Sequence, residues 1–216
     1  MTRDKYIHQL HDVKDHAIAM GIKAEELVND AILALENQDT EMAENVIGRD
    51  REIDELYLDL EERVIRVIAT QAPVAVDLRL LLTALKNATD VERVGDFAKD
   101  IAEIAIELKD HIYFTKLIMI PKMAEIAMKM LKEAMEAFDK EDVELAKGVY
   151  LQDDIVDEIF SRLFRTMTSY VMENPSNIGQ ALRLMLVARH LERIADHAVN
   201  IANRTIYFKE GRIEYI

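Results

Sequence analysis

The chain repeats itself over most of its length, and this repeat limits the possible folds more than any other feature. A shift of 100 residues places the phrase ERVGDFAKDIA at 92–102 on ERIADHAVNIA at 192–202. Pro73 meets Pro175 at a shift of 102. Any two amphipathic helices share apolar positions, but they are not expected to share prolines and acids as well. We therefore interpret the chain as one structural unit present twice.

Each unit is predicted to consist of three long helices. The 216 residues include only 6 Gly and 3 Pro, so the backbone has few places to turn, and the apolar residues follow helical spacing. The fold class is therefore all-α, with two tandem three-helix bundles, 1–111 and 112–216, related by a pseudo-two-fold axis. The expected helices cover residues 4–37, 39 or 40 to just before Pro73, 76–111, a segment after HIYF that ends near 139 with Pro121 in its first turn, 141–173, and a segment after Pro175 that ends near 207.

Charge and composition exclude several classes of protein. The 41 acidic and 27 basic residues give a formal net charge of -14, which repels nucleic acids and anionic lipids and favours cations or basic partners. The absence of cysteine excludes disulfides and thiolate metal sites. No run of about 18 apolar residues is present to span a bilayer, and the first residues lack a signal-peptide pattern. We expect a cytoplasmic protein with no membrane span that binds no nucleic acid.

Acidic residues form rows on two of the predicted helices. A spacing of four residues stacks side chains along one edge of a helix. Both rows lie outside the apolar seam of their helix, where such rows are ordinarily solvated. The row in the third helix is Glu92, Asp96 and Asp100, and the row in the sixth helix is Glu192, Asp196 and Asn200.

A second set of acids lies within the apolar stripes. Asp50 continues the stripe of the second helix and Asp153 continues that of the fifth, while Asp54 and Asp157 follow one turn later. A carboxylate that faces a neighbouring helix is costly unless a cation, a base or solvent compensates it. If the second and third helices pack antiparallel, four or five carboxylates share a small volume and raise one another's pKa.

This crowding predicts metal binding. Divalent or trivalent cations relieve the repulsion, and oxygen ligands suit Fe, Mn or Mg, with Zn also possible. The alternative is a metal-free helical adaptor in which Arg49, Arg93 and Lys99 neutralise the acids. We favour metal because the acid pairs recur in both halves. The predicted ligands are Asp50, Asp54, Glu92, Asp96, Asp100, Asp153, Asp157, Glu192, Asp196 and Asn200.

At these residues the chain resembles the PhoU family, regulators that accompany bacterial phosphate-specific transporters. The resemblance covers essentially the whole length and rests on DREID at 50–54, DDIVD at 153–157, LKNATDVERVGDFAKDIA at 85–102 and ARHLERIADHAVNIA at 188–202. It implies two three-helix bundles, each with a multinuclear metal cluster at its surface, iron being the first choice. The family's E/D-x-x-x-D motifs correspond here to Asp50 with Asp54, Glu92 with Asp96, Asp153 with Asp157, and Glu192 with Asp196.

Three positions bear on how far this pattern transfers. Asp100 becomes Asn200 in the second half, so the second site is expected to hold fewer charges or fewer ions. Asp153 and Asp154 are adjacent, and the repeat register favours Asp153 as the ligand. His197 stands where the first half has a phenylalanine, and its side chain could join the second metal site only by bending round the helix.

The resemblance also implies a function. A member of this family is expected to signal phosphate sufficiency by restraining the phosphate transporter and its sensor histidine kinase, and it is not an enzyme. Its partners would be the transporter's ATPase subunit and the cytoplasmic region of the kinase, and a homodimer is expected.

The competing enzymatic interpretation is a carboxylate-bridged di-iron oxidase or metal-storage bundle. That chemistry uses Glu-x-x-His motifs, and none of the six histidines has a glutamate three residues before it. The methionines of the fourth helix are expected to fill the core rather than to line a docking groove. HIYFTKLIMI at 111–120 is expected to form a buried connection between the halves rather than an exposed patch.

Overall fold

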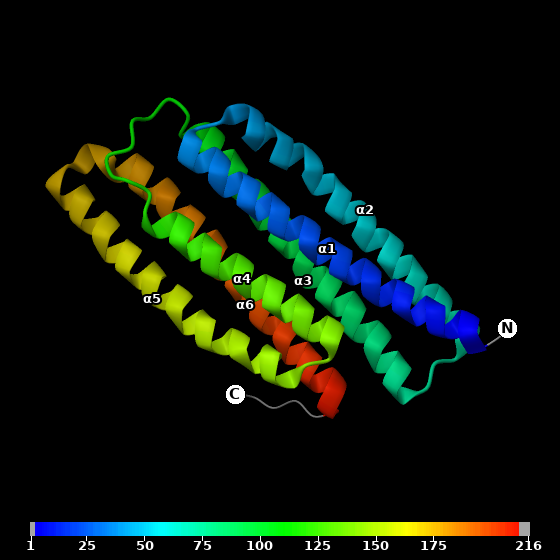
Figure 1. Ribbon diagram of the computed structural model, residues 1–216. Coiled ribbons are helices and arrows are strands. Elements are labelled where there is room, and N and C mark those ends of the chain that lie inside the picture. The colour runs from blue at the N-terminus through cyan, green and yellow to red at the C-terminus, as the bar shows by residue number, and fades with distance from the viewer. Residues whose placement is uncertain (1–2, 212–216) are drawn as a thin grey trace.

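Six long helices make up the regular structure of residues 3–211, the part of the chain that the computed structural model describes (Figure 1). A short 3-10 helix, η1 (Pro175–Asn177), is the one addition to them in that range. The predicted all-α class is therefore confirmed. The helices are α1 (Arg3–Asn37), α2 (Thr40–Gln71), α3 (Ala75–Glu107), α4 (Met119–Lys140), α5 (Val143–Glu173) and α6 (Ile178–Glu210).

Helices α2, α4 and α5 begin at residues that favour the start of a helix. Asp39 accepts a hydrogen bond from the backbone N–H of Met42 at 3.0 Å and caps α2. Asp142 caps α5 in the same way, accepting from the N–H groups of Glu144 and Leu145. Pro121 is the third residue of α4, in the first turn, as expected.

Three predicted helix bounds were wrong. The third helix ends at 107 rather than 111, because the chain leaves it there to cross to the second bundle. The fifth helix begins at 143 rather than 141, because Glu141 takes a left-handed backbone conformation (φ 54°) in the tight turn after α4. The sixth helix continues to 210 rather than 207, and the next residue, Gly211, caps it with a left-handed backbone conformation (φ 70°).

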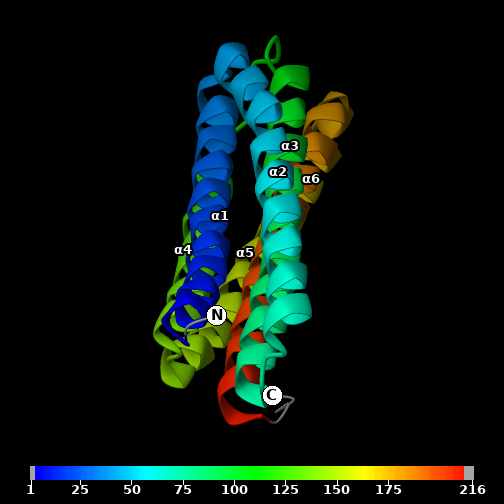
Figure 2. The same ribbon diagram turned by 90° about the vertical axis from the view of Figure 1, so that its right-hand side faces the viewer.

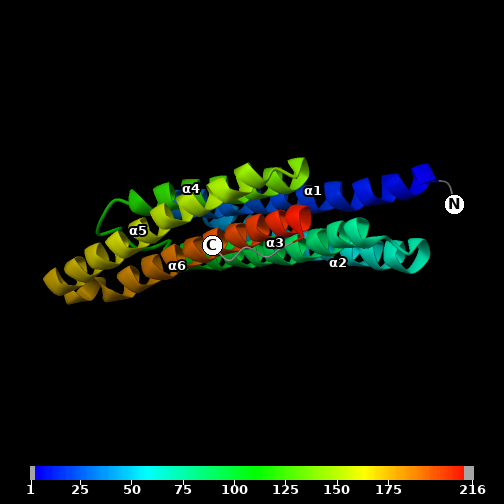
Figure 3. The ribbon, with the colours of Figure 1, turned by 90° about the horizontal axis from the view of Figure 1, so that it is seen from below.

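The two three-helix bundles meet through α3 and α6, which lie side by side and run antiparallel (Figures 1 and 2). Arg183 on α6 pairs with Glu107 on α3 at 2.6 Å, and near the other end Arg204 donates to the carbonyl of Lys86. This register brings the two copies of the repeated phrase level with each other. Helices α1 and α4 also contact each other, while α2 packs on α1 and α3, and α5 packs on α4 and α6. Figure 3 shows the elongated molecule that results, with the helices along its length.

The core contains the methionines of α4. Met123 and Met130 are fully buried and Met135 nearly so, which confirms that these residues fill the core. Met119 and Met128 are partly buried against it. Helices α1 and α4 approach closely at Gly21, where a Cβ atom would lie only 2.9 Å from Cγ of Met135.

The connection between the bundles is only partly buried. Tyr113 donates to the carbonyl of Leu35, and Gln180 accepts from the N–H of Phe114 at 3.0 Å, so the aromatic residues are anchored. The isoleucine at 112 is 95% exposed. Ile118 is 71% exposed, while Tyr113 and Phe114 are partly buried, so the expectation of a buried connection is only partly met. No helix in the described range is long and apolar enough to cross a membrane.

Replacing Phe138 by alanine tests the shared core. Phe138 is completely buried, with its ring centroid 6.5 Å from that of Phe208. We expect Phe138→Ala to lower the free energy of unfolding by about 3–5 kcal/mol, because a large cavity remains. The measurement is chemical denaturation followed by circular dichroism. Phe164→Ala is the matched control, since that ring is 58% exposed, and it should cost less than about 1 kcal/mol. Equal losses in the two variants would contradict this packing.

Candidate metal centres

The first acidic cluster lies where α2 packs against α3. Asp50 and Asp54 come from α2, and Glu92 and Asp96 come from α3. Burial raises the pKa of Asp54, and the neighbouring carboxylates of Asp50 and Asp96 raise it further. Burial likewise raises the pKa of Glu92, with Asp96 the next largest cause in the same direction. Four of the five predicted ligands of the first half therefore share one electrostatic environment.

Two basic side chains reach into this first cluster. Lys99 on α3 donates from Nζ to Oδ2 of Asp50 at 3.0 Å, and this hydrogen bond raises the pKa of the lysine. Arg93 bonds Asp96 at 2.8 Å. Arg49, by contrast, pairs with acids of α1 and not with the cluster. Of the three basic residues expected to neutralise these acids in the metal-free alternative, Lys99 and Arg93 do pair with the cluster and Arg49 does not.

The second acidic cluster lies at the corresponding contact of α5 and α6. Burial raises the pKa of Asp153 to about 6, and Asp157, Asp196 and Glu192 are among the carboxylates that raise it further. Burial also raises the pKa of Glu192. Asp154 is exposed, and its carboxylate also raises the pKa of the neighbouring Asp153.

The basic residues of the second cluster pair only with acids of their own helix. Arg189 contacts both carboxylate oxygens of Glu192, and Arg193 bonds Asp196 at 3.0 Å. These pairs span three residues along α6 and lie at the surface. Within residues 3–211 no lysine or arginine forms an ion pair with Asp153.

The last residue of each predicted row behaves differently from the other members. Asp100 lies 3.7 Å from Nδ1 of His190, across the contact between the two bundles. Asn200 is exposed. His197 also faces the other bundle, with its Nδ1 at 2.6 Å from Oδ1 of Asp90. Asp100 and His197 therefore belong to the α3–α6 contact, and His197 stays out of the second cluster.

Sequence reasoning missed Asp90 and its partners. This carboxylate is 5% exposed, and it forms an ion pair with Arg204 in addition to the contact with His197. Burial lowers the pKa of His197 and of His190. The available signal was the helical spacing that places Asp90 on the same face of α3 as Val94 and Ile101, since a buried acid needs a partner on a neighbouring element.

The donors in both clusters suit a hard cation, because each cluster offers four carboxylates to one region of the surface. Their present orientation is not that of a closed site. Across the described residues, no three His, Asp or Glu side chains converge on one point at which a metal could be held. Arg93, Arg189 and Arg193 hold three of the carboxylates in salt bridges. Metal binding therefore requires these side chains to reorient.

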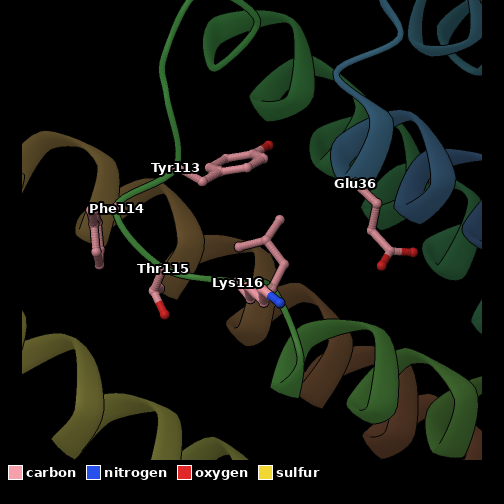
Figure 4. Close-up of a pocket in the computed structure, with 6 residues that line it drawn as sticks. Glu36, Tyr113, Phe114, Thr115 and Lys116 are labelled. Carbon is pink, nitrogen blue, oxygen red and sulfur yellow. The ribbon is translucent and has the colours of Figure 1, made fainter.

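A separate hollow of about 510 Å³ lies beside the connection between the bundles (Figure 4). The side chains of Tyr113 and Lys116 border it on one side, and Glu36 of α1 lies across the opening. Burial raises the pKa of Tyr113 to about 12, so its hydroxyl stays protonated as a hydrogen-bond donor to α1. None of the clustered acids lines this hollow, and the acidic clusters remain the candidate sites.

Comparison with known proteins agrees with this architecture. The family model described as "PhoU domain" matches the chain twice, over residues 18–105 and 120–205. A phosphate-specific transport system accessory protein PhoU homolog of Aquifex aeolicus is 42% identical over 209 residues, which are 97% of this chain and 95% of the relative. The Pseudomonas aeruginosa homolog is 36% identical and is covered to 84%, over 94% of this chain.

Two solved structures have the same fold. The crystal structure of PhoU from Pseudomonas aeruginosa superposes with a TM-score of 0.92 at 35% identity, covering 96% of this chain and 100% of that one. The phosphate transport system regulatory protein PhoU from Streptococcus pneumoniae superposes with a TM-score of 0.90 at 26% identity, covering 98% and 100%. The duplicated three-helix bundle, the paired acids and these relatives together establish that the chain belongs to the PhoU family.

Proposed function

We propose that this chain is a metal-binding, non-catalytic regulator of phosphate uptake and of the phosphate-starvation response. In this proposal it restrains a phosphate ABC transporter and its sensor histidine kinase when phosphate is sufficient. Relatives that match nearly the whole chain are named as accessory or regulatory proteins of phosphate transport, which supports the phosphate part. The observation that carries the metal part is the pair of acidic clusters, one at the same helix contact in each repeat.

The chain's own residues would bind and orient the metal. Carboxylates from two helices face each other in each cluster, so one ion or several could be bridged between α2 and α3 or between α5 and α6. Iron is the first choice, and manganese, magnesium and zinc have compatible ligand preferences. The positive charge that a bound metal supplies would remove the repulsion between the carboxylates.

The proposed partners are the transporter's ATPase subunit and the cytoplasmic region of the kinase. The chain's net charge of -14 favours basic surfaces on such partners, because complementary potentials speed and orient association. Action in the cytoplasm and assembly as a homodimer are part of the same proposal. A metal-free adaptor is the second candidate, favoured by the Lys99–Asp50 and Arg93–Asp96 pairs that already neutralise part of the first cluster.

Removing two carboxylates tests the metal part of the proposal. We expect protein purified without chelators to contain at least one metal ion per chain. The double variant Asp153→Asn with Asp157→Asn should lose metal from the second cluster and bind it at least about tenfold more weakly. Elemental analysis and titration calorimetry give the readout, and Asp154→Asn is the control on an exposed edge. Substoichiometric metal in the native protein, with no loss of thermal stability in the double variant, would support the metal-free adaptor instead.

The pKa of Asp153 predicts a pH dependence of the metal-free protein. Its folded value of about 6 lies above the ordinary value of 3.8, so the folded chain binds this proton more tightly than the unfolded chain. The free energy of unfolding should therefore fall as pH rises from about 4 to about 6, and the deficit should persist above that range. Asp153→Asn should raise the melting temperature at pH 8 and give no gain at pH 4. Asp154→Asn should show only a smaller form of this pattern, because Asp154 is one of the neighbours that raise the pKa of Asp153. A gain at pH 4 alone would refute the prediction.

Phosphate-dependent association tests the signalling part. Tagged protein expressed at high and low phosphate should capture the transporter's ATPase subunit or the sensor kinase more strongly at one phosphate level. Mass spectrometry of the captured proteins gives the measurement. Capture of neither partner at either phosphate level would remove the signalling assignment and leave the metal clusters unaffected.

A further inference from the structure

The two acidic clusters differ at the residue three positions after Asp96 in the first repeat and after Asp196 in the second. In the first repeat this residue is Lys99, and a shift of 100 places Val199 at the same point of the second repeat. The two flanking stretches, ERVGDFAKDIA and ERIADHAVNIA, are otherwise closely similar. The exchange of an ammonium group for an isopropyl group therefore falls at equivalent places beside the two clusters.

Lys99 is tied to the least accessible acid of the first cluster. Its Nζ lies 3.0 Å from Oδ2 of Asp50, whose side chain is only 7% exposed. The contact joins α3 to α2, so it spans the same helix pair that a bridging metal would span. A charge-assisted hydrogen bond to a buried carboxylate is stronger than a surface pair, because water competes less for the two groups.

The second cluster, like the first, has two basic residues that pair with its acids, but neither of them links two helices. Arg193 pairs with Asp196 three residues away on its own helix, just as Arg93 pairs with Asp96, and Arg189 pairs with Glu192 in the same way. Among the described basic residues of the two clusters, only Lys99 in the first cluster makes a contact between two helices. The side chains of Arg189 and Arg193 are about half exposed, and such pairs are readily broken by solvent and salt. Asp153 of α5 has acidic neighbours and, in the described part of the chain, no basic partner.

We propose that Lys99 acts as a built-in counter-cation of the first cluster, so that the second cluster is the tighter metal site and fills first. The proposal rests on the metal-binding part of the proposed function. A metal at Asp50 must displace the ammonium group and then tolerate it as a nearby like charge. A metal at Asp153 meets no such competitor. This order is opposite to the one that the change from Asp100 to Asn200 suggests, and Asp100 itself lies against His190 of the other bundle.

A reciprocal exchange tests this order with Mn²⁺ as the probe. Chelator-treated full-length protein is titrated with Mn²⁺ and followed by calorimetry and by the loss of the free-ion electron paramagnetic resonance signal. Asp50→Asn and Asp153→Asn assign each binding phase to a cluster. We expect the tighter phase to vanish with Asp153→Asn. Lys99→Val should tighten the weaker phase about tenfold, and Val199→Lys should weaken the tighter phase by a similar factor.

Lys86→Val is the matched control for net charge. It removes one positive charge from the same helix 13 residues away, about 20 Å along the axis, which exceeds the screening length of about 8–10 Å. It should leave both phases unchanged. Circular dichroism and thermal melting check that each variant is folded, and Lys99→Val decides the question even if Val199→Lys does not fold.

The outcomes separate this proposal from the function on which it rests. Two binding phases that ignore the substitution of Lys99, or a tighter phase that belongs to Asp50, would overturn the role of Lys99 and leave metal binding intact. An absence of Mn²⁺ binding in every variant would overturn both. An equal effect of Lys86→Val would show that net charge, and not the contact with Asp50, sets the affinity.

Discussion

The antiparallel contact of α3 with α6 is the interaction on which the rest of the structure depends. It joins the two bundles through polar groups that are aimed at each other, with Asp90 against His197 and Arg204 and with Asp100 against His190. Phe97 lies between the two histidine rings, with centroid distances of 5.6 and 5.7 Å. Once this contact is fixed, α2 and α5 are left on separate flanks, and each carries its acids to its own side of the central pair.

The same scaffold tolerates a concentration of charge that would otherwise weaken it. The acids of each cluster lie where two helices pack, and burial and repulsion between carboxylates both raise the pKa of Asp54 in the first cluster and of Asp153 in the second. Such groups are retained at a cost in stability, which is typical of positions that serve binding. The apolar core behind them offsets the cost, since Ile53 and Val156, one turn from the acids, are completely or almost completely buried.

Much of this organisation could be predicted from sequence. Helical periodicity, prolines and the repeat give six helices within a few residues, because those signals are local. The meeting of Asp50 with Glu92, and of Asp153 with Glu192, followed from short connections that force neighbouring helices to run antiparallel. The partners of Asp90 and Asp100 could not be predicted, because they depend on the register between the two bundles, which no local spacing encodes. The bond between Lys99 and Asp50 was one alternative among several, since a lysine can reach any of the clustered acids.

One packing detail at the clusters also differs between the repeats. A Cβ atom at Gly95 would lie 3.0 Å from Cδ1 of Ile53, so the small residue on α3 accommodates the larger one on α2. In the second repeat the corresponding residues are Ala195 and Val156. The residue on the α6 side is thus larger by one carbon than its counterpart on α3, and the residue on the α5 side is smaller by one carbon than its counterpart on α2. The volume at each helix contact is thereby conserved while the sequences diverge.

The polar groups of the α3–α6 contact also decide which surfaces can pair. If a first repeat met a second copy of itself in this register, an aspartate would take the place of His190 and would oppose Asp100. Two second repeats would set His190 against an uncharged asparagine and would lack the acid that holds His197. Only unlike halves satisfy all of these groups. The two repeats have therefore diverged into complementary halves. This complementarity favours packing of the two bundles of one chain against each other over the exchange of bundles between chains.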